Sequence, residues 1–250
     1  MSQNLKMRLK KRNVSIHTNS IVEGISKEND KLICSFKEKE ETCTVEGDSI
    51  LLAIGRSSCI DDLFDSDINI EIERNKIVVD ENFETSIKDI YAIGDVIFGI
   101  QLAHVASAQG VVAVEKINGK VPTINLDIVP SCVYTDPEIA SVGVTEEEAK
   151  NMNIPVVVGK TITSSNGKSI LSNDERGFMK VIFRKDSHVI IGAQMMCSRA
   201  TDMIGELSTA IANKLTDKDL KSAMRAHPTY NEALVDAVES VFAYNIVKRK

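Results

Sequence analysis

The segment RAHPTYNE, residues 225–232, holds the side chains best suited to acid–base chemistry in this 250-residue chain. Pro228 fixes its own φ and biases His227 towards an extended backbone, so the imidazole is held just before an expected helix. Glu232, in the first turn of that helix, is expected within about 2.6–3.2 Å of one ring nitrogen, leaving the other available as a base. The same spacing fits a plain helix start, which favours a proline and an acid, so both interpretations stay open.

A second candidate site is the turn Gly94-Asp95, which follows an expected strand at residues 89–93. A carboxylate at a strand end can accept hydrogen bonds from the hydroxyls of a sugar or ribitol chain. A helix expected at residues 103–117 begins just after the turn, and the positive end of its dipole favours negative charge on a ligand. A glycine-aspartate pair is also a common turn. His104 in that helix is either a ligand or base, or a surface or packing residue.

Composition restricts the classes of protein that fit the chain. Hydrophobic residues make up 43% and charged residues 26%, as in globular proteins. The net charge of −6 argues against a nucleic-acid partner. No apolar run approaches the roughly 18 residues of a membrane span, and no secretory signal is evident, so we expect a cytoplasmic chain without a membrane partner. The cysteines form no close pair, which predicts reduced thiols and no metal site: Cys34, Cys43, Cys59, Cys132 and Cys197.

The N-terminal third is expected to consist mainly of strands. Short apolar or alternating stretches predict them at residues 14–17, 20–25, 32–36 and 42–45. The apolar run that ends in glycine at residues 48–56 predicts a strand buried on both faces. A basic cluster precedes them and predicts a solvated helix face, with a phosphate-binding patch as the alternative: Lys6, Arg8, Lys10, Lys11 and Arg12.

The remainder is expected to hold a strand–turn–helix unit and then an α+β unit, joined by a linker near residues 118–120. Helix 103–117 is expected to carry a stripe of apolar residues at 103, 106, 110, 111, 114 and 117. Further strands are predicted at residues 76–79, 156–163, 178–184 and 189–196, the last two as an antiparallel hairpin. Helices are predicted at residues 145–152, behind a capping box, and at 200–215, 217–224 and 231–247.

Taken together, these stretches resemble the flavin-dependent pyridine nucleotide-disulphide oxidoreductases. The matching motifs occur in family order: ILLAIGR at 50–56, Thr85-Ser86 with IYAIGDV at 90–96, LAHVA at 102–106, DPEIASVG at 136–143 and HPTYNE at 227–232. The LAH motif resembles the branch that oxidises dihydrolipoamide more than the glutathione or mercuric reductase branches.

The resemblance implies α/β remnants of NAD- and FAD-binding domains, at residues 1–58 and 59–122. An α+β interface domain with an antiparallel sheet and helices then follows at 123–250 and builds a homodimer. The resemblance also implies that four residues border the nicotinamide cofactor: Ala53, Ile54, Gly55 and Arg56. Those implied to contact FAD are Gly94, Asp95, Leu102, Ala103 and His104.

The resemblance also assigns His227 as the acid/base residue and Glu232 as its orienting partner. In the family this histidine deprotonates dihydrolipoamide, whose thiolate attacks a redox disulphide of the other subunit, and electrons pass through FAD to NAD. The partners of an intact member are lipoyl-bearing components of 2-oxoacid dehydrogenase or glycine-cleavage systems.

Several family features are missing from the chain. It has no C-x-x-x-x-C pair and neither of the two glycine fingerprints, and Arg225 stands where a second histidine is common. We therefore expect the C-terminal half of a family member, inactive by itself. One alternative is a non-catalytic, self-associating interaction module, which an N-terminal half encoded immediately upstream would exclude. Another is a glutathione- or mercuric-reductase-type relative, against which the LAH motif argues.

Overall fold

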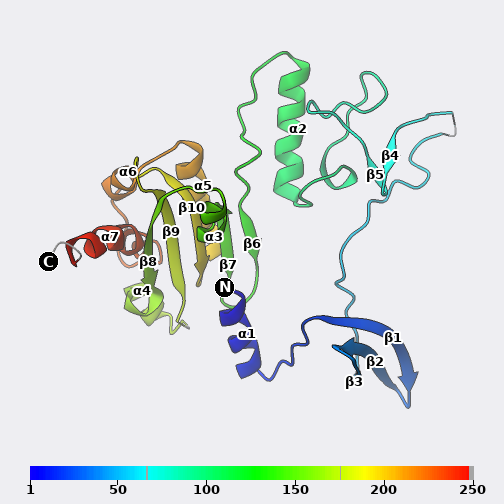
Figure 1. Cartoon of the computed structure of the whole chain (residues 1–250), viewed down its shortest axis with the longest axis horizontal. Helices are drawn as coiled ribbons and strands as arrows, with labels where there is room; N and C mark the ends of the chain where they lie inside the picture. The colour runs from blue at the N-terminus through cyan, green and yellow to red at the C-terminus, as the bar shows by residue number, and fades with distance from the viewer. Residues whose placement is uncertain (66, 175, 248–250) are drawn as a thin grey trace. The chain divides into compact units, whose positions relative to one another are not determined.

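The computed structural model describes residues 1–65, 67–174 and 176–247, and for residues 242–247 it describes the backbone alone. The chain divides into two compact units, Met1–Ser57 and Ser58–Lys250 (Figure 1). In the described part, no helix has both the length and the apolar character needed to cross a bilayer.

The first unit is a helix followed by an antiparallel meander. Its elements are α1 (Ser2–Lys11), β1 (Ser20–Glu28), β2 (Lys31–Glu38) and β3 (Glu41–Gly47), and the strand order is β1-β2-β3. Three of the predicted strands are confirmed, and the basic cluster lies on α1, which buries no residue. The strand predicted at residues 14–17 is wrong, because this stretch connects α1 to β1 without strand pairing.

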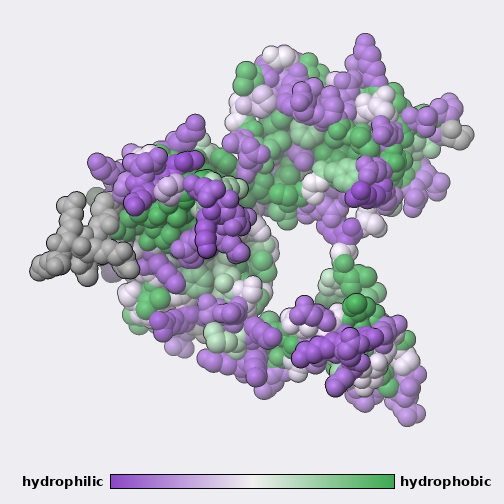
Figure 2. All heavy atoms as spheres, in the orientation of Figure 1, coloured by the Kyte–Doolittle hydropathy of each residue, from purple (hydrophilic) through white to green (hydrophobic). Residues whose placement is uncertain are grey.

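The strand predicted at residues 48–56 is also wrong. Residues 50–56 form an extended connection without strand partners, and Leu51 and Ile54 are 89% and 91% exposed. Figure 2 shows apolar surface along this connection. A strand buried on both faces requires neighbouring strands and covering helices, and no described residue of this chain pairs with the segment. The apolar sequence of residues 50–56 is therefore typical of a buried strand, but no element of the described chain covers it.

The first unit has a very small apolar core, since Phe36 is the one buried hydrophobic residue among its described residues. With so little buried surface, local opening costs little free energy. We expect limited proteolysis to remove residues 1–57 first and to leave a fragment that contains residues 123–241. Mass spectrometry of the early products checks this. Cleavage at equal rates along the chain would contradict it.

The second unit begins with a small apolar core to which one face of a helix contributes. β4 (Ile72–Glu73) and β5 (Lys76–Ile77) form a short hairpin, η1 (Gly94–Val96) is a 3-10 turn, and α2 covers Ala103–Ile117. The predicted helix is confirmed, and its apolar stripe is not the face that is buried. Val105, Val112 and Ala113 are buried, whereas Val114 and Ile117 are exposed. The strand predicted at residues 89–93 is reduced to one isolated bridge at Tyr91.

The rest of the second unit is an α+β assembly, as predicted. Its sheet has the antiparallel order β6-β7-β10-β9-β8. The strands are β6 (Ser131–Val133), β7 (Ile139–Gly143), β8 (Val156–Ile162), β9 (Phe178–Arg184) and β10 (Ile190–Met196). The predicted hairpin is β9–β10, while β6 and β7 had not been predicted. The helical elements are α3 (Glu146–Asn151), η2 (Thr163–Ser165), α4 (Gly167–Leu171), α5 (Ala200–Ala212), α6 (Asp217–Ser222) and α7 (Glu232–Val247).

Two helices pack on this sheet and enclose the main core. α5 lies against β7 and β10, and α7 lies against β8 and β9 (Figure 1). One buried cluster joins the sheet to both helices. It includes Phe183 of β9, Leu207 of α5 and Val238 of α7, which are almost fully buried. At Gly159 in β8 the approach of α7 is so close that a Cβ would overlap the carbonyl oxygen of Ala237. The sheet and helices therefore form a rigid base for the segment between α6 and α7.

Candidate functional site

His227 and Glu232 lie in contact at the start of α7. Their Nδ1 and Oε1 atoms are 2.8 Å apart, so the predicted contact is present. The peptide bond between His227 and Pro228 is cis. The imidazole is open to solvent, with 77% of the side chain exposed, whereas the Glu232 side chain is 30% exposed. When Nδ1 carries the proton and donates it to this carboxylate, Nε2 is left as an acceptor that faces outward.

Glu232 also holds the backbone of the same segment. Its Oε2 accepts a hydrogen bond from the Thr229 amide at 2.8 Å. This amide, and secondarily His227, lowers the pKa of the Glu232 carboxyl, because both favour the ionised form. The stability that these bonds contribute is therefore present above the ordinary pKa of a glutamate and is lost as the pH falls through the lowered pKa. Glu232 is ionised wherever a neutral histidine can act as a base.

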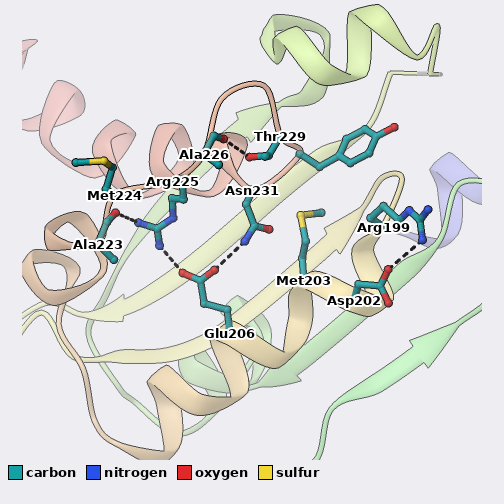
Figure 3. A pocket seen from close by; sticks show the side chains of 11 residues that line it. Arg199, Asp202, Met203, Glu206, Ala223, Met224, Arg225, Ala226, Thr229 and Asn231 are labelled. Atoms are coloured by element: carbon teal, nitrogen blue, oxygen red, sulfur yellow. Dashed lines mark hydrogen bonds and ion pairs between the residues drawn. The ribbon is translucent and has the colours of Figure 1, made fainter.

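A hydrogen-bond network braces the segment from outside. Glu206 on α5 pairs with the Arg225 guanidinium through Oε1 and accepts a hydrogen bond from Asn231 Nδ2 through Oε2 at 3.0 Å (Figure 3). On another side, Asn166 Nδ2 donates to the Thr229 carbonyl at 3.0 Å. The sequence had not indicated Glu206 or Asn166, because no local motif connects them to residues so distant in the chain.

A cavity of about 610 Å³ lies beside the segment (Figure 3). Ala226 and Thr229 contribute to its wall, but His227 does not. The remaining lining residues are Arg199, Asp202, Met203, Glu206, Ala223, Met224, Arg225, Tyr230 and Asn231. The polar groups on this wall are largely paired with one another, as in the Arg199–Asp202 ion pair.

The Gly94-Asp95 turn is packed against α2. Gly94 has φ +74°, and a Cβ there would approach Ala106 Cβ at 3.0 Å, so the turn requires glycine. Its amide donates to Gln109 Oε1 at 2.7 Å. The Asp95 carbonyl accepts hydrogen bonds from Ser58 Oγ at 2.8 Å and Lys76 Nζ at 2.5 Å. These bonds fix the backbone of Asp95 while its carboxylate lies partly exposed.

The start of α2 carries the other residues predicted to contact FAD. Leu102 is the N-cap, and its carbonyl accepts hydrogen bonds from Val105 and Ala106, both at 3.0 Å. Ala103 begins the helix. His104 Nε2 lies 2.9 Å from the carbonyl oxygen of Pro130, a contact that corresponds to the packing alternative considered for this histidine.

The residues predicted to border NAD lie in the first compact unit. Ala53, Ile54, Gly55 and Arg56 belong to the exposed connection after β3, and Gly55 has φ +125°. The structure thus places the predicted residues in separate groups: one in this connection, one around Gly94-Asp95 and α2, and the His227–Glu232 pair.

The thiols form no redox pair in the structure. All five cysteines are free, and burial raises the pKa of Cys197 to about 12, which keeps that thiol protonated. Among the described residues, no group of His, Cys, Asp or Glu side chains is arranged to hold a metal ion.

Two family models match the chain. The pyridine nucleotide-disulphide oxidoreductase model matches residues 1–110, and the model of the dimerisation domain of the same family matches residues 129–238. Between them they match most of the chain.

The similar curated proteins are dihydrolipoyl dehydrogenases. The chain is 39% identical over 241 residues to the one from Bacillus subtilis, which covers 96% of this chain and 51% of that protein. The one from Geobacillus stearothermophilus is 38% identical over 240 residues, again 96% of this chain and 51% of the relative. The chain thus spans about half the length of these relatives.

Solved structures show the same fold. LpdA from Mycobacterium tuberculosis has a TM-score of 0.87 at 25% identity, over 95% of this chain and 51% of its own. The HOCl-induced flavoprotein disulphide reductase RclA from Escherichia coli has a TM-score of 0.85 at 25% identity, over 95% of this chain and 54% of its own. The order of the motifs, the antiparallel α+β unit and both family models agree, and the chain belongs to the pyridine nucleotide-disulphide oxidoreductase family.

Proposed function

We propose that the chain provides the C-terminal half of a flavin-dependent dihydrolipoamide dehydrogenase, which oxidises dihydrolipoamide and reduces NAD. The observation that carries the proposal is the His227–Glu232 pair, with 2.8 Å between Nδ1 and Oε1 and an exposed imidazole. The similarity to dihydrolipoyl dehydrogenases over 96% of the chain supports the choice of substrate.

In this proposal His227 moves one proton. Its Nε2 accepts the proton of a dihydrolipoamide thiol, which becomes a thiolate, and Glu232 stabilises the imidazolium that results. The thiolate then attacks a disulphide, which the rest of the enzyme supplies because this chain has no C-x-x-x-x-C pair. The exposed ring suits this role, since it leaves the imidazole accessible to the thiol of a substrate.

The turn and helix of the second unit are suited to part of an FAD molecule. Asp95 offers a carboxylate beside a turn, where it can accept hydrogen bonds from the hydroxyls of the ribityl chain. At the start of α2, which Leu102 caps, the amides of Ala103 and His104 have no partner within the helix. The close packing of Gly94 on Ala106 holds the turn and the helix start together. When bound, FAD supplies two-electron transfer between the dithiol and NAD. Ala53, Ile54, Gly55 and Arg56 are proposed to border the nicotinamide cofactor.

The proposal includes the domain plan and the partners. Residues 1–58 and 59–122 would complete NAD- and FAD-binding domains, and residues 123–250 would form a homodimer interface, consistent with the dimerisation-domain match. The enzyme would be cytoplasmic and would act on lipoyl-bearing components of 2-oxoacid dehydrogenase or glycine-cleavage systems.

The test compares the chain with a chimera in which the N-terminal half of the Bacillus subtilis relative precedes it. The chain alone should be colourless and inactive, since it lacks the glycine turn that holds the FAD pyrophosphate. The chimera should carry flavin absorbance through gel filtration and should reduce NAD with dihydrolipoamide but not with glutathione. A chimera that binds flavin yet does not oxidise dihydrolipoamide would refute the proposal. A flavin absorption band in the chain alone would refute the expectation that FAD binding requires the N-terminal half.

A further inference from the structure

We propose that Glu206 is a positioning residue for the His227–Glu232 pair, because one carboxylate on α5 holds both ends of the segment that carries the pair. The inference rests on the proposed function, in which this pair is the base and its orienting partner. Glu206 contacts neither member directly, so it would act through their neighbours in the chain.

The two carboxylate oxygens of Glu206 contact residues near opposite ends of the segment 225–232. Oε1 pairs with Nη2 of Arg225, two residues before His227. Oε2 accepts a hydrogen bond from Asn231 Nδ2 at 3.0 Å, one residue before Glu232. His227 therefore lies between the two attachment points, and Glu232 directly follows the second. Figure 3 shows both contacts of the Glu206 carboxylate.

Because the Arg225 side chain is buried, its guanidinium needs partners within the protein. Only 8% of the Arg225 side chain is exposed, and its Nη1 donates to the carbonyls of Leu220 and Ala223, each at 2.6 Å. Those carbonyls belong to the end of α6 and the connection after it. Without Glu206 the buried guanidinium would lose its counter-charge, an arrangement that folded proteins avoid by moving the side chain towards water. Any such movement shifts the backbone that leads into His227.

The imidazole depends on the position of the segment because its own ring is largely exposed. With 77% of its side chain exposed, His227 gains little orientation from packing, and its hydrogen-bond partner among the described residues is Glu232. The position of the Glu232 carboxylate follows the first turn of α7, which Asn231 connects to Glu206. Glu206 therefore determines which ring nitrogen meets a carboxylate, and so which nitrogen carries the proton when the ring is neutral.

The test reads the proton position directly in the full chain labelled with ¹⁵N-histidine. The chain has 4 histidines, and His227→Gln identifies the signals of His227. In long-range ¹H–¹⁵N spectra at alkaline pH, we expect the proton on Nδ1 in about tenfold preference to Nε2, as a hydrogen bond to a carboxylate implies. In Glu206→Ala this preference should fall by about threefold or more, because the two sites are coupled.

Asp202→Ala is the matched control. Asp202 lies on the same helix, lines the same cavity and pairs with Arg199 at 3.3 Å, but it does not contact the segment. Its removal should leave the His227 signals unchanged. A second variant separates the contact at Asn231 from the counter-charge of the buried guanidinium. Asn231→Ala removes the hydrogen bond to Glu206 Oε2 and leaves the Glu206–Arg225 ion pair in place, so the Nδ1 preference should fall in this variant too.

An unchanged Nδ1 preference in Glu206→Ala would overturn the inference, and so would an equal loss in Asp202→Ala. Far-UV circular dichroism accompanies each variant, and if Glu206→Ala unfolds, an unchanged preference in Asn231→Ala would overturn the inference. These results are independent of the enzyme activity. An inactive chimera would refute the proposed function while a responsive His227 signal would still support the role of Glu206.

Discussion

His227→Gln should remove the thiol-oxidising half-reaction of the chimeric enzyme almost entirely while leaving its flavin in place. The expected loss is ~10²- to 10⁴-fold, the range typical for removal of a general acid–base group. Glutamine can still donate a hydrogen bond to Glu232 but cannot take up a thiol proton near neutral pH. Rapid-mixing measurement of flavin reduction by dihydrolipoamide gives the rate, and the visible flavin spectrum gives the cofactor content.

The chain offers a close control for this substitution. His17 also pairs with a carboxylate, with Nδ1 2.9 Å from Glu38 Oε2, but it lies in the first unit and has no assigned role. His17→Gln should leave the half-reaction unchanged. Glu232→Gln should cost less than His227→Gln, since it weakens orientation and charge support but retains the base. Full activity in His227→Gln would return this segment to the status of a proline-led helix start.

Gly159→Ala should be strongly destabilising although it adds a single methyl group. Gly159 lies in β8 beneath α7, where a Cβ would overlap the Ala237 carbonyl oxygen and come within 2.9 Å of Val241 Cγ2. Backbone atoms of a packed helix cannot yield as a flexible side chain can, so α7 must lift from the sheet. We expect the free energy of unfolding to fall by about 3 kcal/mol, at the upper end of overpacking effects. Urea denaturation followed by far-UV circular dichroism measures this change.

For Gly205→Ala we expect the opposite change, a rise in the free energy of unfolding. Gly205 is in the interior of α5, where an added Cβ would meet nothing within 4 Å. Alanine favours a helix by about 1 kcal/mol relative to glycine, so this variant should be more stable than the parent chain. If Gly159→Ala and Gly205→Ala shift the urea midpoint alike, the close packing of α7 on β8 is not what determines the stability of this unit.

Elements with strong local signals could be predicted from the sequence. The capping box at Thr145 and Glu148 is present, and the β9–β10 hairpin and helix α2 lie where turn residues and periodicity placed them. Tertiary context decided the rest. α2 has apolar residues all round, so periodicity could not determine that Val112 is buried and Val114 exposed. The buried strand predicted at residues 48–56 failed because it needs neighbours that the described chain does not provide.

The candidate site was predictable to the extent that it is local. His227 and Glu232 are five residues apart, and the turn of the backbone between them sets their contact at 2.8 Å. Arg225 was recognised as a departure from the family motif. Its contact with Glu206 was not, since a salt bridge between α5 and the distant α6–α7 connection leaves no signal in a single sequence. Long-range bracing therefore becomes visible only in three dimensions.

The exposed connection at residues 50–56 also has a consequence for handling the protein. Leu51, Leu52 and Ile54 are 89%, 71% and 91% exposed, and the run ILLAI contains neither a charge nor a proline. Short segments of this composition are prone to stack into intermolecular cross-β aggregates, and flanking charges such as Asp48 and Arg56 oppose that process. Expression yield and shelf life will thus depend on whether this pentapeptide is shielded, by a chaperone or by the remainder of an assembled enzyme.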